Sequence, residues 1–135
     1  MTALSAPRLA TERSGQTSTV PVAAATVVWQ GGIVVMEGGV AKPGKTATGL
    51  VVLGIAEETV DNSTGAAGAK SVTPRRGCFR FVNLGSDPVT AADVGQDVWL
   101  VDDQTIAKSS GTATRSAAGK LIDVDDVGAW VRIGV

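Results

Sequence analysis

The chain has 135 residues, of which 44% are hydrophobic and 19% are charged, and its formal net charge is −1. This length and composition predict one domain with a buried core and exclude an intrinsically disordered chain. Nucleic-acid binding is disfavoured because lysine and arginine are not in excess over the acidic residues. Histidine is absent, which removes the commonest general base and the commonest metal ligand.

The N-terminal segment differs from the rest of the chain. Thr2–Thr19 is rich in Ser, Thr, Ala and Gly and shows neither helical nor strand periodicity. We therefore predict an arm over residues 1–20 and a single β domain over residues 21–135. Two interpretations of the arm stay open: a disordered terminus, or an extended segment that orders on the surface of a partner.

No targeting or membrane-spanning segment is predicted. Met1–Gly15 lacks the apolar stretch of a secretory signal. The longest apolar run, Val20–Trp29, is much shorter than the roughly 20 residues that span a bilayer. We expect a soluble protein that is made in the cytoplasm and binds no membrane.

The body reads as short strands separated by turn residues. Apolar, often β-branched runs predict strands at Thr26–Trp29, Ile33–Met36, Val40–Ala41, Leu50–Ala56, Ala69–Thr73, Gly77–Val82, Asp97–Val101, Thr105–Ala107, Lys120–Val124 and Ala129–Val135. Thr90–Asp93 matches a capping box and predicts one helical turn. No segment has helical periodicity over three turns. The prediction is an all-β fold, a small β-sandwich or barrel-like domain with an extended N-terminal arm.

Alternation within the strands predicts which side chains share a face. In the strand predicted at Leu50–Ala56, Val51, Leu53 and Ile55 are expected on one face. Aromatic residues make up only 4% of the chain, so the core is expected to consist mainly of Val, Ile, Leu and Ala. Such a core is thin, which favours additional stabilisation by partners. The single cysteine, Cys78, excludes an intramolecular disulfide and is expected to be a buried or half-buried thiol.

One motif match is misleading. Gly39–Thr46 fits the phosphate-binding P-loop pattern, and Val98–Asp102 imitates the apolar strand whose aspartate would hold magnesium. A P-loop functions because its backbone opens a helix whose N-terminus faces the phosphates. Here Ala47–Gly54 contains two glycines and a β-branched run, which predicts a strand. We therefore expect a hairpin followed by a loop, with no nucleotide bound.

The charged and aromatic clusters also favour structural interpretations. Asp102–Asp103 and Asp123–Asp126 lack the ligand spacing of a calcium loop and are interpreted as turns. Arg75 and Arg76, with Arg80 nearby, form a cationic cluster whose simplest interpretation is a solvated turn. The three tryptophans, Trp29, Trp99 and Trp130, are interpreted as core residues, although exposed tryptophan is typical of interfaces. We predict no catalytic, cofactor-binding or metal-binding residue, and no enzyme.

Several segments resemble the small head decoration, or cement, proteins of tailed bacteriophages and prophages. The similarity is carried by Gly54–Asn62, by the Arg75-Arg76-Gly77 turn with Phe79 and Phe81, and by Asp93–Gly95 with Asp102–Ala107. It covers roughly Thr26 to the C-terminus, and the arm matches least. It is a similarity of strands and turns and includes no catalytic signature.

The resemblance implies a virion protein that binds the outside of the expanded capsid shell and bridges major capsid protein subunits. It also implies a homo-oligomer, with a trimer at threefold axes favoured. Two arm leucines would serve as apolar anchors, and four arginines would supply positive charge towards the shell: Leu4, Arg8, Leu9, Arg13, Arg75 and Arg76. The alternative function is a surface-exposed receptor- or carbohydrate-binding β module. Sugar sites usually need exposed aromatic residues, of which this chain has few: it contains three tryptophans and no tyrosine.

Overall fold

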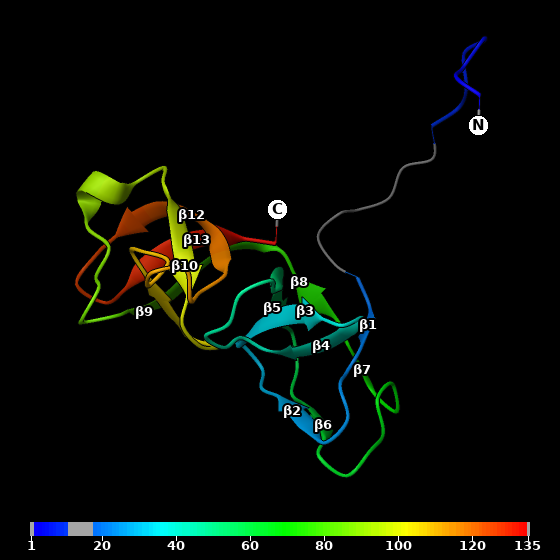
Figure 1. Ribbon diagram of the computed structural model, residues 1–135, viewed down its shortest axis with the longest axis horizontal. Coiled ribbons are helices and arrows are strands. Elements are labelled where there is room, and N and C mark those ends of the chain that lie inside the picture. Colours follow the sequence, from blue (N-terminus) through cyan, green and yellow to red (C-terminus); the bar gives the residue numbers. More distant parts are fainter. Residues whose placement is uncertain (1, 11–17, 135) are drawn as a thin grey trace.

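The computed structural model describes residues 2–10 and 18–134. The fold is all-β, as predicted, and its helical element is a short 3₁₀ turn, η1 (Ala91–Asp93). The predicted capping box begins this turn: the Thr90 amide donates to the Asp93 carboxylate at 2.8 Å. Figure 1 shows a barrel at one end of an elongated body and a smaller sheet beside it.

Five strands close the barrel. They are β9 (Gly77–Asn83), β10 (Asp97–Leu100), β11 (Thr105–Ala107), β12 (Ala117–Val124) and β13 (Ala129–Ile133), joined in the order β10-β11-β9-β13-β12 and back to β10. The predicted hairpins β10–β11 and β12–β13 both form. On its other side, β11 pairs parallel to β9, with Thr105 opposite Val82. No local turn joins these two strands, so their parallel pairing arises only when the barrel closes.

The N-terminal half of the body forms an open sheet and two short strand pairs. The sheet has the order β4 (Val40–Pro43), β3 (Ile33–Glu37), β5 (Val51–Ala56) and β8 (Pro74–Arg75). The pairs are β1 (Val20–Pro21) with β7 (Ser71–Val72), and β2 (Thr26–Val28) with β6 (Val60–Asn62). Pro74 lies on an edge strand, where its missing N–H costs no ladder hydrogen bond.

Two aliphatic cores lie on the two sides of β3. Ile33 and Val35 belong to the core that fills the barrel. Val34, between them in sequence, belongs to the core under β1, β2 and β6. This arrangement follows from the alternation of side chains along a strand, and it joins the two halves into one body. Among the residues that the structure describes, Phe81 is the only buried aromatic, which confirms the expected aliphatic core.

The predicted face of β5 is wrong because the strand contains a β-bulge. Val34 lies opposite Gly54, but Val35 lies opposite Val52, so the register skips Leu53. An extra residue reverses the alternation beyond it. Val52 and Ile55 therefore both pack on the barrel core, whereas Leu53 packs on the second core.

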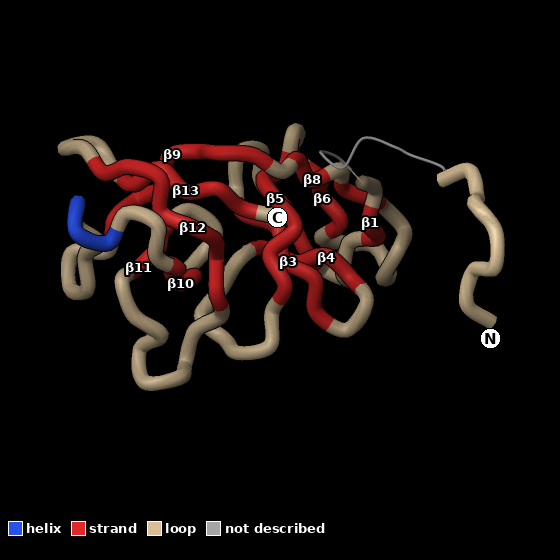
Figure 2. Tube along the Cα trace, turned by 90° about the horizontal axis from the view of Figure 1, so that it is seen from above, coloured by secondary structure: helices blue, strands red, loops and turns tan. Residues whose placement is uncertain are grey.

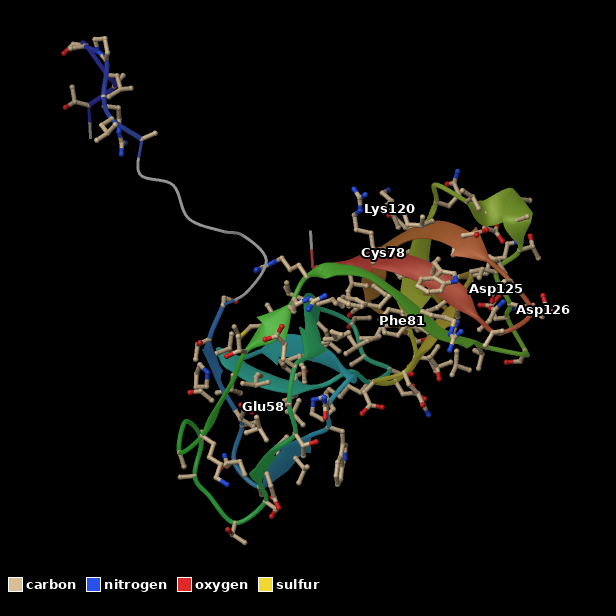
Figure 3. All side chains as sticks on the ribbon, turned by 180° about the vertical axis from the view of Figure 1, so that it is seen from behind. Glu58, Cys78, Phe81, Lys120, Asp125 and Asp126 are labelled. Carbon is tan, nitrogen blue, oxygen red and sulfur yellow. The ribbon has the colours of Figure 1, made fainter. Side chains whose placement is uncertain are left out.

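The expectation of a buried or half-buried Cys78 is also wrong. The alternation along β9 is as predicted, with Phe81 buried and Phe79 packed on the barrel core. The other face of the strand lies on the outside of the barrel, where Cys78 is exposed. Figure 3 labels Cys78 and Phe81 on this strand. The strand buries only one of its two faces, and Cys78 lies on the other.

Candidate interaction surfaces

The described part of the arm is uncovered. Residues 2–10 form no strand or helix and are exposed throughout; they stand apart from the body in Figure 2. The exposed fraction of Leu4 is 70% and that of Leu9 is 91%. Arg8, between them, is also exposed. The fourth predicted arm residue, Arg13, lies outside the described residues.

The two adjacent arginines enter different hollows of the body. Arg75 ends β8, where its guanidinium lies 3.7 Å from the Glu57 carboxylate and 5.8 Å from the centre of the Phe79 ring. Arg76 follows β8, is half-buried, and lines a groove on the neighbouring side. The side chains of Arg75 and Arg76 therefore do not form one cationic cluster, because successive side chains leave an extended backbone in opposite directions.

A mostly apolar groove separates β5 from β12. Its volume is about 420 Å³, and its walls include Val51 and Leu53 on one side and Ala117 and Gly119 on the other. Val51 is 60% exposed. β5 pairs with β8 only at Ile55 and Ala56. Gly134 lies against the Leu53 carbonyl, and Val51 and Val52 have no paired strand on that side. This open edge is where an additional strand of another chain would pair.

Charged side chains stand at the rim of the groove. Lys120 and Asp97 form an ion pair of 2.7 Å in which both side chains are more than half exposed, and Arg76 lies at the same groove. The sequence does not predict this groove. Its walls come from strands far apart in the chain, and no local pattern marks their approach.

A second hollow is a polar cleft beside an exposed tryptophan. Its volume is about 330 Å³, and it is lined by the Trp29–Gly32 turn together with Asp103 and Gln104. Trp29 directly follows β2 and is 60% exposed. The prediction that all three tryptophans are core residues is therefore wrong for Trp29. The strand ends at Val28, and the Gly31-Gly32 turn directs the indole outward.

The other two tryptophans are half-buried and belong to neither core, so the prediction of core residues is not confirmed for them either. Trp99 lies on β10. Trp130 lies on β13 and donates from its indole nitrogen to the Asp125 carboxylate at 3.0 Å. The Arg80 guanidinium lies 6.0 Å from the centre of the Trp130 ring. The hydrogen bond from Trp130 is the main cause of a lowered pKa of Asp125.

The aspartates of the two clusters lie in turns, as predicted, except Asp123, which lies in β12 opposite Trp130. Asp102 accepts a hydrogen bond from the Gln104 amide at 2.9 Å, and Asp125 accepts one from the Val127 amide at 2.9 Å. Asp125 and Asp126 stand at the tip of the β12–β13 hairpin (Figure 3). Burial, followed by the charge of Asp102, raises the pKa of Asp103. Within residues 2–10 and 18–134, no group of three or more such side chains is arranged to hold a metal ion.

The segment that matches a P-loop has the structure expected from its sequence. It runs through β4 into a loop, and the chain continues into β5 with no helix between them. The Thr46 hydroxyl donates to the Val101 carbonyl at 2.7 Å, a contact between the sheet and the barrel. The helix N-terminus on which a P-loop depends is replaced by a strand.

Comparisons with known proteins return no match: no protein-family model fits the chain, and no curated protein or solved structure is significantly similar to it. In the described part of the chain, no helix has the length and apolar character that crossing a membrane requires.

Proposed function

We propose that this protein is a structural protein of a tailed-bacteriophage virion, which binds the outside of the capsid shell and bridges neighbouring major capsid protein subunits. Its function is binding alone, with no catalytic step and no cofactor. The observation that carries the proposal is the uncovered arm, in which Leu4 and Leu9 are 70% and 91% exposed. The resemblance of several sequence segments to head decoration proteins, described above, supports the same assignment.

The energetics of the arm favour an extensive contact. Ordering a flexible segment costs on the order of 1 kcal/mol per residue in backbone entropy. Burial of one leucine side chain returns about 1.5–3 kcal/mol, so Leu4 and Leu9 alone do not offset the ordering of residues 2–10. Backbone hydrogen bonds to the shell and a charged contact from Arg8 would supply the rest. The arm would therefore lie along the capsid surface over most of its length.

Copies of the protein are proposed to associate as a homotrimer on the shell. The trimer itself is taken from the resemblance. Two features of the body support association: the aliphatic core is small, and the groove beside β5 has an open strand edge with Val51 60% exposed. An apolar groove with an unpaired edge gains stability when another chain covers it.

The proposed location is the exterior of the virion, after synthesis in the cytoplasm of the host bacterium. Arg75 and Arg76 would face acidic groups of the major capsid protein, where surface charges contribute orientation more than affinity. The Arg75 guanidinium already lies near Glu57, so its contribution would be smaller than that of an unpaired arginine.

The experiment is co-sedimentation with shells assembled from the major capsid protein of the same phage. A deletion of Thr2–Thr19 should fold, because the body holds both cores, and should bind the shells at least tenfold more weakly. The double variant Leu4→Ala/Leu9→Ala should show an intermediate loss. Val127→Ala, which shortens an apolar side chain of the body that is 66% exposed, is the matched control. Unchanged binding of the deletion variant would contradict the role of the arm.

The trimer is tested separately by light scattering on the free protein and by its stoichiometry on shells. Three copies in contact around each occupied axis are expected. Single, isolated copies at each site would contradict the proposed association while leaving shell binding itself intact.

A further inference from the structure

The cleft beside Trp29 combines one exposed aromatic ring with a small set of polar side chains. Trp29 is 60% exposed, and Gln30, Asp103 and Gln104 line the same hollow of about 330 Å³. Within the part of the chain that the structure describes, the Gln30 and Gln104 side chains make no hydrogen bond, whereas the Gln30 and Gln104 backbone amides are bonded. The two side-chain amides are thus available to a ligand.

One backbone hydrogen bond joins the two turns that line the cleft, and a second lies within the first turn. The Ile33 amide donates to the Asp103 carbonyl at 2.8 Å, and the Gly32 amide donates to the Trp29 carbonyl at 3.0 Å. A Cβ at Gly32 would lie 3.1 Å from the Trp29 carbonyl oxygen and 3.4 Å from the Asp103 carboxylate. Glycine at this position therefore lets the two turns approach closely. A site held in this way loses little entropy when a ligand binds.

We propose that this cleft binds a neutral carbohydrate, with the indole of Trp29 as the stacking surface and Gln30, Asp103 and Gln104 as hydrogen-bond partners. This function goes beyond shell attachment and does not depend on it. It would give the outer face of the protein an affinity for glycans.

The chemistry of a sugar ring matches both halves of the cleft. One face of a hexose presents C–H groups, whose partial positive charge is attracted to the negative face of an aromatic ring. The rim of the ring presents hydroxyls, each a donor and an acceptor. A side-chain amide offers both roles, and a carboxylate accepts two such bonds. The carboxylate of Asp103 would repel an acidic sugar, so a neutral one is favoured.

The hollow continues beyond the first sugar position. A second cleft of about 250 Å³ shares Gln30 and Gly31 with the first and reaches Glu57. Both volumes are at or below the low end of the range of small-ligand sites, about 300–1,000 Å³. Together they fit a short oligosaccharide better than a single sugar. An oligosaccharide should therefore bind more tightly than its monosaccharide.

A protein partner is the competing occupant, and the surroundings of Trp29 disfavour it. Protein hot spots place a tryptophan at the centre of an apolar patch that excludes water. Trp29 is instead flanked by two glutamines, two glycines and an aspartate in a concave site.

The test is saturation-transfer NMR on the full-length protein with glucose, galactose, mannose and N-acetylglucosamine, and with linear trisaccharides of glucose and of N-acetylglucosamine. At least one of these probes should receive saturation at its ring protons, with a millimolar Kd and tighter binding of the trisaccharide. Trp29→Ala should weaken that binding at least tenfold, whereas Trp29→Phe should keep part of it. Asp103→Asn should weaken it less than Trp29→Ala, because an amide oxygen still accepts a hydrogen bond.

Val127→Ala is the control for an exposed apolar side chain outside the cleft, and it should bind the sugars as the natural chain does. Thermal melting of each variant establishes that it is folded. Saturation transfer to none of the six probes, or equal transfer in Trp29→Ala, would overturn the proposal. Loss of shell binding in Trp29→Ala, with no sugar bound by the natural chain, would assign the cleft to a protein partner and would equally overturn it.

Discussion

The hydroxyl of Ser116 accepts a hydrogen bond of 3.0 Å from the backbone amide of Leu50. The same hydroxyl donates to the Ala47 carbonyl at 2.6 Å, and Ser116 is only 6% exposed. Ser116 immediately precedes β12 of the barrel, and Leu50 immediately precedes β5 of the open sheet. One buried side chain thus fastens the two halves of the body together beside the apolar groove.

Substitution Ser116→Ala should lower the free energy of unfolding by about 1–3 kcal/mol, because the buried Leu50 amide and Ala47 carbonyl lose their partner. Urea denaturation measures the change. Ser86→Ala, at an exposed position, is the matched control and should change stability by less than about 0.5 kcal/mol. Equal effects of the two substitutions would show that the Ser116 bonds do not stabilise the junction.

Stability should also depend on pH through Glu37. The hydrogen bonds from Lys42 and then Lys45, each 2.8 Å from the carboxylate, lower the pKa of Glu37 from 4.5 to about 2. A carboxyl whose pKa is lower in the folded than in the unfolded chain stabilises the fold above its unfolded pKa. That contribution is lost as the pH falls from about 4.5 to about 2.

The natural chain should therefore melt at a higher temperature than Glu37→Gln at neutral pH, and the difference should vanish towards pH 2. The difference should be small, because the pair is partly solvated and such ion pairs contribute little. Glu58→Gln, at an exposed carboxyl, controls for the loss of one charge. A difference between the natural chain and Glu37→Gln that stays constant across this pH range would contradict the assignment.

The thiol of Cys78 should react in the folded protein, because the residue is exposed on the outer face of β9. One equivalent of a maleimide should couple to the native protein nearly as fast as to the protein unfolded in urea, as mass spectrometry would measure. Coupling that required unfolding would show that this face of the barrel is covered.

Local features of the fold could be predicted from the sequence, and features set by distant segments could not. The β12–β13 hairpin and the η1 turn follow from alternation and from a capping box, both of which act within a few residues. The parallel pairing of β11 with β9 depends on barrel closure. The burial of Asn62 also depends on a segment far away in the sequence: it is 2% exposed and donates to the Ala23 carbonyl at 2.9 Å.

The same difference between local features and features set by distant segments applies to the interaction surfaces. The exposure of Leu4 and Leu9 was expected because their segment has no apolar pattern. The groove beside β5 and the cleft beside Trp29 were not predicted, since each is built from turns and strands that only the fold brings together. Arg75 and Arg76 are adjacent in sequence but line different hollows. Their separation cannot be predicted from the composition of the chain.

The most direct test of the proposed shell-binding role is cryo-electron microscopy of tailed-phage particles purified from lysates that contain this chain. The account predicts density for the β body on the outside of the shell at threefold axes, in groups of three. Residues 2–10 should lie as a continuous extended segment against the major capsid protein. Particles whose outer surface lacks this density, or that hold the protein only inside the shell, would contradict the account.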